Sequence, residues 1–268
     1  AIGYQSMDAL TAATDNIAIG YNALKGASNT GSHKNIAIGS YALDGTSSNS
    51  STENIAIGYN AMTAATTALE NVCIGDSAGA ALTDGADNVF IGDVACDASQ
   101  SGIKMVAIGK ASMSDGNITA AAVGTVGIGY NALKALTTGT GNTAIGYRAG
   151  TAITTASHGN VAIGYDSLLS LDGGDYNIAV GHTALGYNVV GSQNVAIGYE
   201  SMANFIADAS DHGQNTTVGY RAGKFNVDGT GNTFIGSEAG QGITSPRLGG
   251  NDNTAVGESA GLVLQGAA

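Results

Sequence analysis

Residues 16–24 read NIAIGYNAL, and this nine-residue pattern recurs along the whole chain. It reads NIAIGSYAL from Asn35 and NVAIGYESM from Asn194. Its glycine occurs in fifteen copies, which follow one another at intervals of 17 to 21 residues. The residue before that glycine is always Ile or Val, and the third residue after it is always Ala or Ser. Such regular self-similarity predicts a protein built from stacked structural repeats.

Each repeat predicts a short strand followed by a bend. Ile17 and Ile19 alternate with Asn16 and Ala18, which is the period of two of a β-strand. We expect the β-branched Ile and Val to occupy the buried face of that strand. The glycine permits a bend, after which we expect a second short strand with its Ala or Ser pointing inward. The polar segment that follows carries all the variation in length, so it closes the coil as an exposed loop.

An asparagine four positions before the glycine is the other marker of the repeat. It occurs in twelve of the fourteen copies that include this position. We expect these side chains to form a ladder, in which each amide bonds to its neighbours or caps the adjoining turn. The structural-motif residues that we single out are Asn16, Gly20, Asn35, Gly39, Asn54, Gly58, Asn142, Gly146, Asn194 and Gly198.

Composition agrees with a folded repeat protein. The 268 residues include 42 Gly and only 11% charged residues, while 43% are hydrophobic, which is enough apolar surface to bury. The net charge of −12, with nine Lys and Arg, argues against nucleic-acid binding. No apolar run approaches the roughly 18 residues of a membrane-spanning helix, so we expect no membrane insertion.

We therefore predict an all-β fold, a parallel β-solenoid of about fifteen coils. A single coil of about 17 residues cannot bury its own apolar face, whereas stacked coils share a continuous core. Stacking also pairs the strands of successive coils at about 4.7–4.9 Å per step. We expect residues 1–268 to form one repeat domain. Because the first copy lacks its asparagine, we expect this domain to be a segment of a longer fibre protein.

The pattern Asn-x-x-(Ile/Val)-Gly-x-x-(Ala/Ser) resembles the head repeats of YadA-type trimeric autotransporter adhesins and the repeat regions of phage tail-fibre-like proteins. The resemblance covers essentially the whole chain. It implies a left-handed parallel β-roll assembled as a homotrimeric fibre. Adhesin head repeats are typically shorter than these coils, which favours a tail-fibre-like structural protein over a bacterial surface adhesin head. The implied location is the virion or the cell surface, and the implied partners are other fibre or baseplate segments and host-surface glycans.

Tyrosines recur directly after the motif glycine. This stripe has two interpretations: a row of exposed rings that stack on the sugars of a surface glycan, or a packing ladder between coils or chains. We favour packing, because Ser40, Asp76, Asp93 and Lys110 interrupt the row. The tyrosines concerned are Tyr21, Tyr59, Tyr130, Tyr147, Tyr165, Tyr199 and Tyr220.

Neither metal nor cofactor binding is indicated by the remaining polar residues. The four histidines, His33, His158, His182 and His212, are scattered without a second ligand type at useful spacing. Loop carboxylates, such as those of the pairs 172/175 and 208/211, do not form a calcium-binding repeat. Two cysteines, in different columns of adjacent coils, are expected to be buried free thiols. We expect no catalytic, cofactor or metal site.

Two other function classes stay open for a chain of this kind. The hexapeptides IGYNAL and IGKASM fit the repeat of left-handed β-helix acyltransferases, which are enzymes. In those enzymes three hexapeptides run consecutively in each coil, whereas here one hexapeptide occurs per coil, so we expect no enzyme. The other class is ice binding by a monomeric solenoid. It needs a regular threonine array, and the threonines here lie mostly in the variable segments.

Overall fold

The structure is a computed structural model that describes residues 1–8, 13–26, 31–45, 50–119, 122–154, 157–207, 213–226, 229–242 and 250–262. The regular elements of these residues are parallel β-strands of three residues each. The chain forms two compact units, Ala1–Thr138 and Gly139–Ala268.

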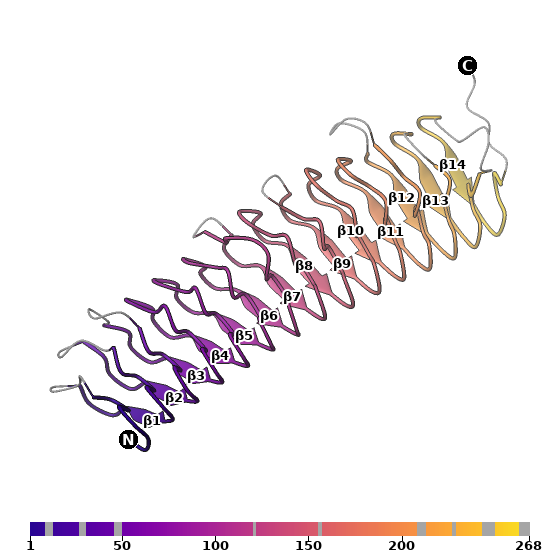
Figure 1. The fold of residues 1–268 in the computed structure, drawn as a ribbon. Helices are drawn as coiled ribbons and strands as arrows, with labels where there is room; N and C mark the ends of the chain where they lie inside the picture. The colour runs from indigo at the N-terminus through magenta and orange to yellow at the C-terminus, as the bar shows by residue number, and fades with distance from the viewer. Residues whose placement is uncertain are drawn as a thin grey trace. The chain divides into compact units, whose positions relative to one another are not determined.

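Both units are β-solenoids in which every coil contributes one strand to a parallel sheet (Figure 1). Strands that follow each other in the sequence pair in register, as Ile36 does with Ile17 and with Ile55. In the first copy of the motif, Ile2 forms an isolated parallel bridge with Ile19. The predicted all-β parallel solenoid is confirmed. The strands of the first unit are β1 (Ile17–Ile19), β2 (Ile36–Ile38), β3 (Ile55–Ile57), β4 (Val72–Ile74), β5 (Val89–Ile91), β6 (Val106–Ile108) and β7 (Val126–Ile128); those of the second are β8 (Thr143–Ile145), β9 (Val161–Ile163), β10 (Ile178–Val180), β11 (Val195–Ile197), β12 (Thr216–Val218), β13 (Thr233–Ile235) and β14 (Thr254–Val256).

The strand side chains face opposite to the prediction. In all fourteen strands the central residue is buried, while the two flanking residues are partly or largely exposed. Ala37 is fully buried in β2, whereas Ile17 of β1 remains 49% exposed. The expectation that Ile and Val point inward is therefore wrong. The reason is space, because the interior of the coil behind the strand admits a methyl group more readily than a branched side chain.

The interior is filled from the turn that follows each glycine. The third residue after the glycine is a buried Ala or Ser in the inner coils, as predicted, and the fourth is often a buried Leu or Met. Four strands have a central residue larger than Ala, and in those coils the fourth residue after the glycine is small. In these four coils a small turn residue thus makes room for a larger strand residue. The pairs are Cys73 with Gly79, Phe90 with Cys96, Thr217 with Gly223, and Phe234 with Gly240.

The segment after the glycine is a turn, so the prediction of a second strand there is wrong. The second and fourth residues after the glycine adopt left-handed backbone angles, as in Asn22 (φ 55°) and Leu24 (φ 52°). Their N–H groups still bond to neighbouring coils: that of Asn22 donates to the carbonyl of Tyr4 (3.0 Å) and that of Leu24 to the carbonyl of Ala42 (3.0 Å). Left-handed angles cost most residue types about 1 kcal/mol or more each. Stacking against a neighbouring coil offsets that cost.

The motif glycine has a backbone angle that only glycine adopts readily. Gly58 has φ +139°, and a Cβ at this position would collide with the carbonyl oxygen of Gly75 in the next coil. The glycine column therefore allows the coils to stack at the spacing of paired strands.

The asparagine ladder is confirmed and is buried. The side-chain oxygen of Asn177 accepts hydrogen bonds from the backbone N–H and the side-chain amide of Asn194, both at 3.0 Å. The amide of Asn177 donates to the carbonyl of Gly191 (2.9 Å), and its N–H donates to Asn160 (2.8 Å). In the first unit the same pattern runs from Asn16 and ends where Met105 replaces the asparagine. Each rung thus links neighbouring coils and satisfies buried backbone groups.

We predict that Asn177→Ala lowers the free energy of unfolding by about 2–4 kcal/mol, because it leaves the N–H of Asn194 buried without an acceptor. Urea unfolding followed by circular dichroism measures the effect. Val189→Ala, at a position of the same coil that is 38% exposed and outside the sheet, is the control and should change stability by less than about 0.5 kcal/mol. Equal effects of the two substitutions would contradict a structural role for the ladder.

We predict that the core volumes at Phe234 and Gly240 compensate each other. Phe234→Ala should cost about 3–5 kcal/mol by opening a cavity, and Gly240→Leu alone should destabilise by colliding with the ring of Phe234. The double variant restores the Ala and Leu combination found at positions 37 and 43 in the coil of β2. It should therefore be more stable in urea than either single variant. A double variant no more stable than Phe234→Ala would show that the two positions are independent.

Candidate functional site

The outer face of the sheet is the most distinctive surface of each unit. In the first unit all fourteen flanking residues of β1–β7 are Ile or Val. In the second unit β8–β14 present Ile, Val and four Thr in the same positions. Ile145, Ile163, Ile178 and Ile197 are each between 37% and 39% exposed. Neither face carries a charged residue on its described strands, whereas the chain as a whole has a net charge of −12.

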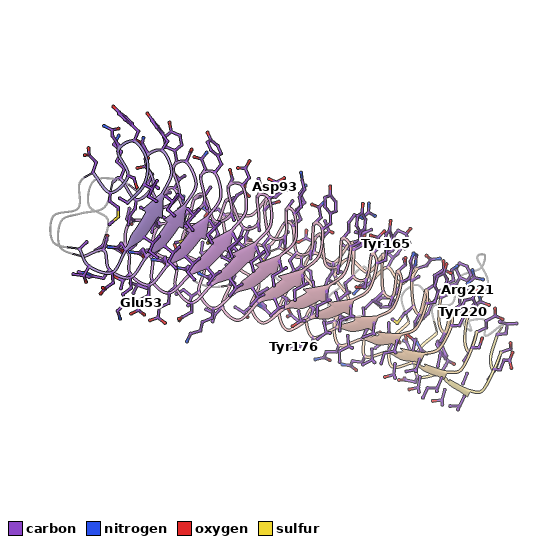
Figure 2. The ribbon with its side chains drawn as sticks, turned by 90° about the horizontal axis from the view of Figure 1, so that it is seen from below. Glu53, Asp93, Tyr165, Tyr176, Tyr220 and Arg221 are labelled. Carbon is purple, nitrogen blue, oxygen red and sulfur yellow. The ribbon has the colours of Figure 1, made fainter. Side chains whose placement is uncertain are left out.

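Two columns of side chains border this face. The post-glycine column contains the residue directly after each motif glycine, and the pre-asparagine column contains the residue directly before each motif asparagine or before the residue that replaces it, such as Met105. Figure 2 shows Asp93 and Glu53 on opposite edges of the first unit's sheet. In the second unit, Tyr165 and Tyr176 likewise lie on opposite edges (Figure 2). The columns therefore form the two long edges of the outer face.

The post-glycine column of the second unit is a continuous ladder of stacked rings. Successive ring centroids lie 4.8, 5.0, 5.1 and 5.5 Å apart, and the ring planes differ by no more than 17°. Since each interior ring stacks on a ring at either side, the ladder presents ring edges and hydroxyl groups rather than free ring faces. The tyrosines are 41–47% exposed. In order, the ladder is Tyr147, Tyr165, His182, Tyr199 and Tyr220.

The first unit has a shorter aromatic group. Tyr4 stacks on Tyr21 (5.5 Å), while Tyr41 contacts Tyr21 and Tyr59 edge to face (5.4 and 6.0 Å). Tyr41 stands one residue beyond the post-glycine column and fills the place that Ser40 leaves empty. Sequence reasoning missed both this substitution and the role of His182. The signal for Tyr41 is an aromatic residue next to a break in the column, and the signal for His182 is an aromatic ring within the column. The predicted residue Tyr130 is 43% exposed.

Ion pairs between coils run beside the ring ladder of the second unit. Arg148 binds Asp166 through two hydrogen bonds (2.8 and 2.7 Å), and its guanidinium lies 5.6 Å from the ring centre of Tyr147. Glu200 accepts hydrogen bonds from Arg221 (2.8 Å) and Lys224 (2.6 Å). Burial raises the pKa of Glu200, but these two cations outweigh burial and hold its pKa below the ordinary value. These pairs link neighbouring coils in the turn next to the ring ladder.

The histidines and acidic residues do not gather into a metal site within the described parts of the chain. His33 and His158 each bond a threonine of the preceding coil, at Thr14 and Thr140. His212 and the acidic residues 208 and 211 lie outside the described residues. His33 and His158 therefore link neighbouring coils.

No protein-family model, curated protein or solved structure matches this chain. Within its described residues there is also no helix long and apolar enough to cross a membrane. The surface geometry thus carries the functional argument.

Cys73 and Cys96 are buried free thiols, as predicted. Burial raises the pKa of both, and the proximity of Cys96 raises that of Cys73 further. We predict that neither reacts with a thiol reagent at neutral pH until the protein unfolds, since the thiolate is the reactive form. Labelling in native buffer and in denaturant, read by mass spectrometry, checks this. Rapid labelling of either cysteine in native buffer would contradict the described packing.

Proposed function

We propose that this chain is a structural fibre segment that assembles as a homotrimer through the outer face of its sheets. The observation that carries the proposal is the array of partly exposed Ile and Val on the strands of both units. A contiguous exposed apolar surface marks an interaction site, since leaving it in water is costly. In the proposed fibre, association covers this face, and the polar segments form the outside.

A second copy of the same chain is the partner that fits this face. Its coils repeat at the same spacing as those of the first copy, so rows of Ile and Val side chains can interdigitate along the whole sheet. The uncharged face also brings no like charges together, although each chain is strongly acidic. Three copies arranged around an axis can cover one another's faces completely, which is the arrangement implied by the resemblance.

In this proposal the segment supplies a rigid, elongated element of a tail-fibre-like or surface-fibre protein. It acts in the virion or at the cell surface, next to other fibre or baseplate segments. The stacked tyrosines give less support to a glycan platform, because their faces are occupied by one another. The outward array is mostly Ile and Val rather than Thr, which favours chain association over ice binding. Catalysis has no supporting group of side chains in the described residues.

We predict that charging the outer face separates the chains. In the double variant Ile163→Glu, Ile197→Glu, a trimer would bring three carboxylates together at each of two levels, where their desolvation is unfavourable. We expect the protein concentration needed for assembly to rise at least about tenfold, which corresponds to about 1.4 kcal/mol. Light scattering after size exclusion measures the mass, and circular dichroism verifies that the coils remain folded.

The matched control is Val189→Glu, Ile206→Glu. These residues are 38% and 41% exposed, as the test residues are, but they lie outside the sheet. The control should keep the mass of the unmodified protein. If the test variant keeps that mass too, or both variants dissociate alike, the outer face is not the interface.

A further inference from the structure

The two edges of the outer face differ in chemistry between the units. Around β8–β12 of the second unit, neither column contains an acidic or basic residue other than His182, and the ion pairs of Arg148 and Arg221 lie in the adjoining turns. The post-glycine column is the ring ladder, and the pre-asparagine column consists of small or uncharged residues. Coil by coil, the opposed positions are Tyr147 and Gly141, Tyr165 and Gly159, His182 and Tyr176, Tyr199 and Gln193, and Tyr220 and Gln214.

The first unit shows the opposite pattern around β4–β6. There, both edges of the same coil carry the same sign of charge. Within one chain, Lys110 pairs with Asp93 of the preceding coil (2.7 Å), whereas the coil of β4 has a carboxylate at both positions. Like charges placed directly opposite each other are unfavourable. The like-charged positions are Glu70 and Asp76, Asp87 and Asp93, and Lys104 and Lys110.

These edges meet in any ring of parallel chains. In a cyclic assembly the contact is head to tail around the axis, so the post-glycine edge of one chain adjoins the pre-asparagine edge of the next. In the second unit, the ring ladder of one chain then faces the glycines and uncharged side chains on the pre-asparagine edge of the next chain. Glycines leave room for the rings, and no like charges are brought together. In β4–β6 the same arrangement opposes like charges. The edges of the second unit are therefore the ones suited to close chain-to-chain packing.

Tyr176 fixes the level of this contact. It is 62% exposed, and its ring lies against Gly159 of the preceding coil, where an added Cβ would come within 2.8 Å of the ring. Gly159 belongs to the coil of Tyr165. The ring of Tyr176 consequently extends along the pre-asparagine edge toward the level at which a neighbouring chain presents Tyr165.

We propose that the ring ladder of the second unit packs against the pre-asparagine edge of a neighbouring copy, with Tyr176 of one chain beside Tyr165 of the next. The inference rests on the proposed self-association and specifies which edges make the contact. It also gives the tyrosine stripe a role in joining chains, in addition to its stacking within one chain.

Oxidative tyrosine cross-linking of the full chain tests this contact. One-electron photo-oxidation with an added persulfate oxidant couples two adjacent tyrosines by a carbon–carbon bond, and each tyrosine loses one hydrogen atom. Coupling within a ladder leaves the mass of the denatured chain almost unchanged, whereas coupling of Tyr176 to a neighbour gives covalent dimers and trimers on a denaturing gel. We expect these species in the unmodified protein and their loss in Tyr176→Phe. Tyr187→Phe, which removes a tyrosine 51% exposed outside both columns, should retain them.

A disulfide test is independent of tyrosine chemistry. Gln214→Cys with Tyr220→Cys places one thiol on each edge of a single coil, separated by the width of the sheet and too far apart to pair within the chain. Mild oxidation should link different chains in the double variant, and neither single variant should form this link.

The outcomes separate the two proposals. A three-chain particle whose cross-linking is unchanged in Tyr176→Phe, or whose double cysteine variant forms no interchain bond, overturns the edge contact and leaves self-association standing. A single-chain particle at all concentrations removes both. Covalent species that vanish only with Tyr176→Phe, together with interchain disulfides, establish the contact.

Discussion

The structure depends on how little room the coil leaves behind its strand. Only a side chain as small as Ala fits at most strand centres, and where Phe90 or Phe234 occupies that position, a small residue in the turn makes space. The branched side chains that flank each centre therefore point outward. A coil that is narrow behind its strand thus leaves the Ile and Val side chains of the strand on the outer face, partly in contact with water.

Polar groups take part of the interior that apolar side chains fill in wider proteins. Each buried asparagine satisfies backbone groups of its own and adjacent coils, so its burial costs little as long as the ladder is complete. The left-handed turns also depend on neighbouring coils. Their backbone angles are unfavourable, and hydrogen bonds to adjacent coils offset that cost. Stability accordingly resides in the contacts between coils, as in other repeat proteins.

The repeat, the parallel strands, the asparagine ladder and the buried Ala or Ser after Gly20 could be predicted, because each depends on a local pattern. The direction of Ile17 and Ile19 could not. Alternation identifies two faces, but the width of the coil decides which one is inside, and hydrophobicity alone suggested the wrong answer. The turn after the glycine was also mistaken for a strand, because left-handed angles at Leu24 leave no mark in the residue type. At the outer face, the tyrosine column was visible in the sequence, whereas its place at the edge of an apolar sheet was not.

The most direct test of the account is the solution mass of the unmodified protein by sedimentation equilibrium over a range of concentrations. If two further copies cover the outer face of each chain, as proposed, we expect a single species with three times the 26.3 kDa mass of the chain. A folded protein that remains a single chain at every concentration would show that the exposed Ile and Val tolerate water, and it would contradict the proposed fibre.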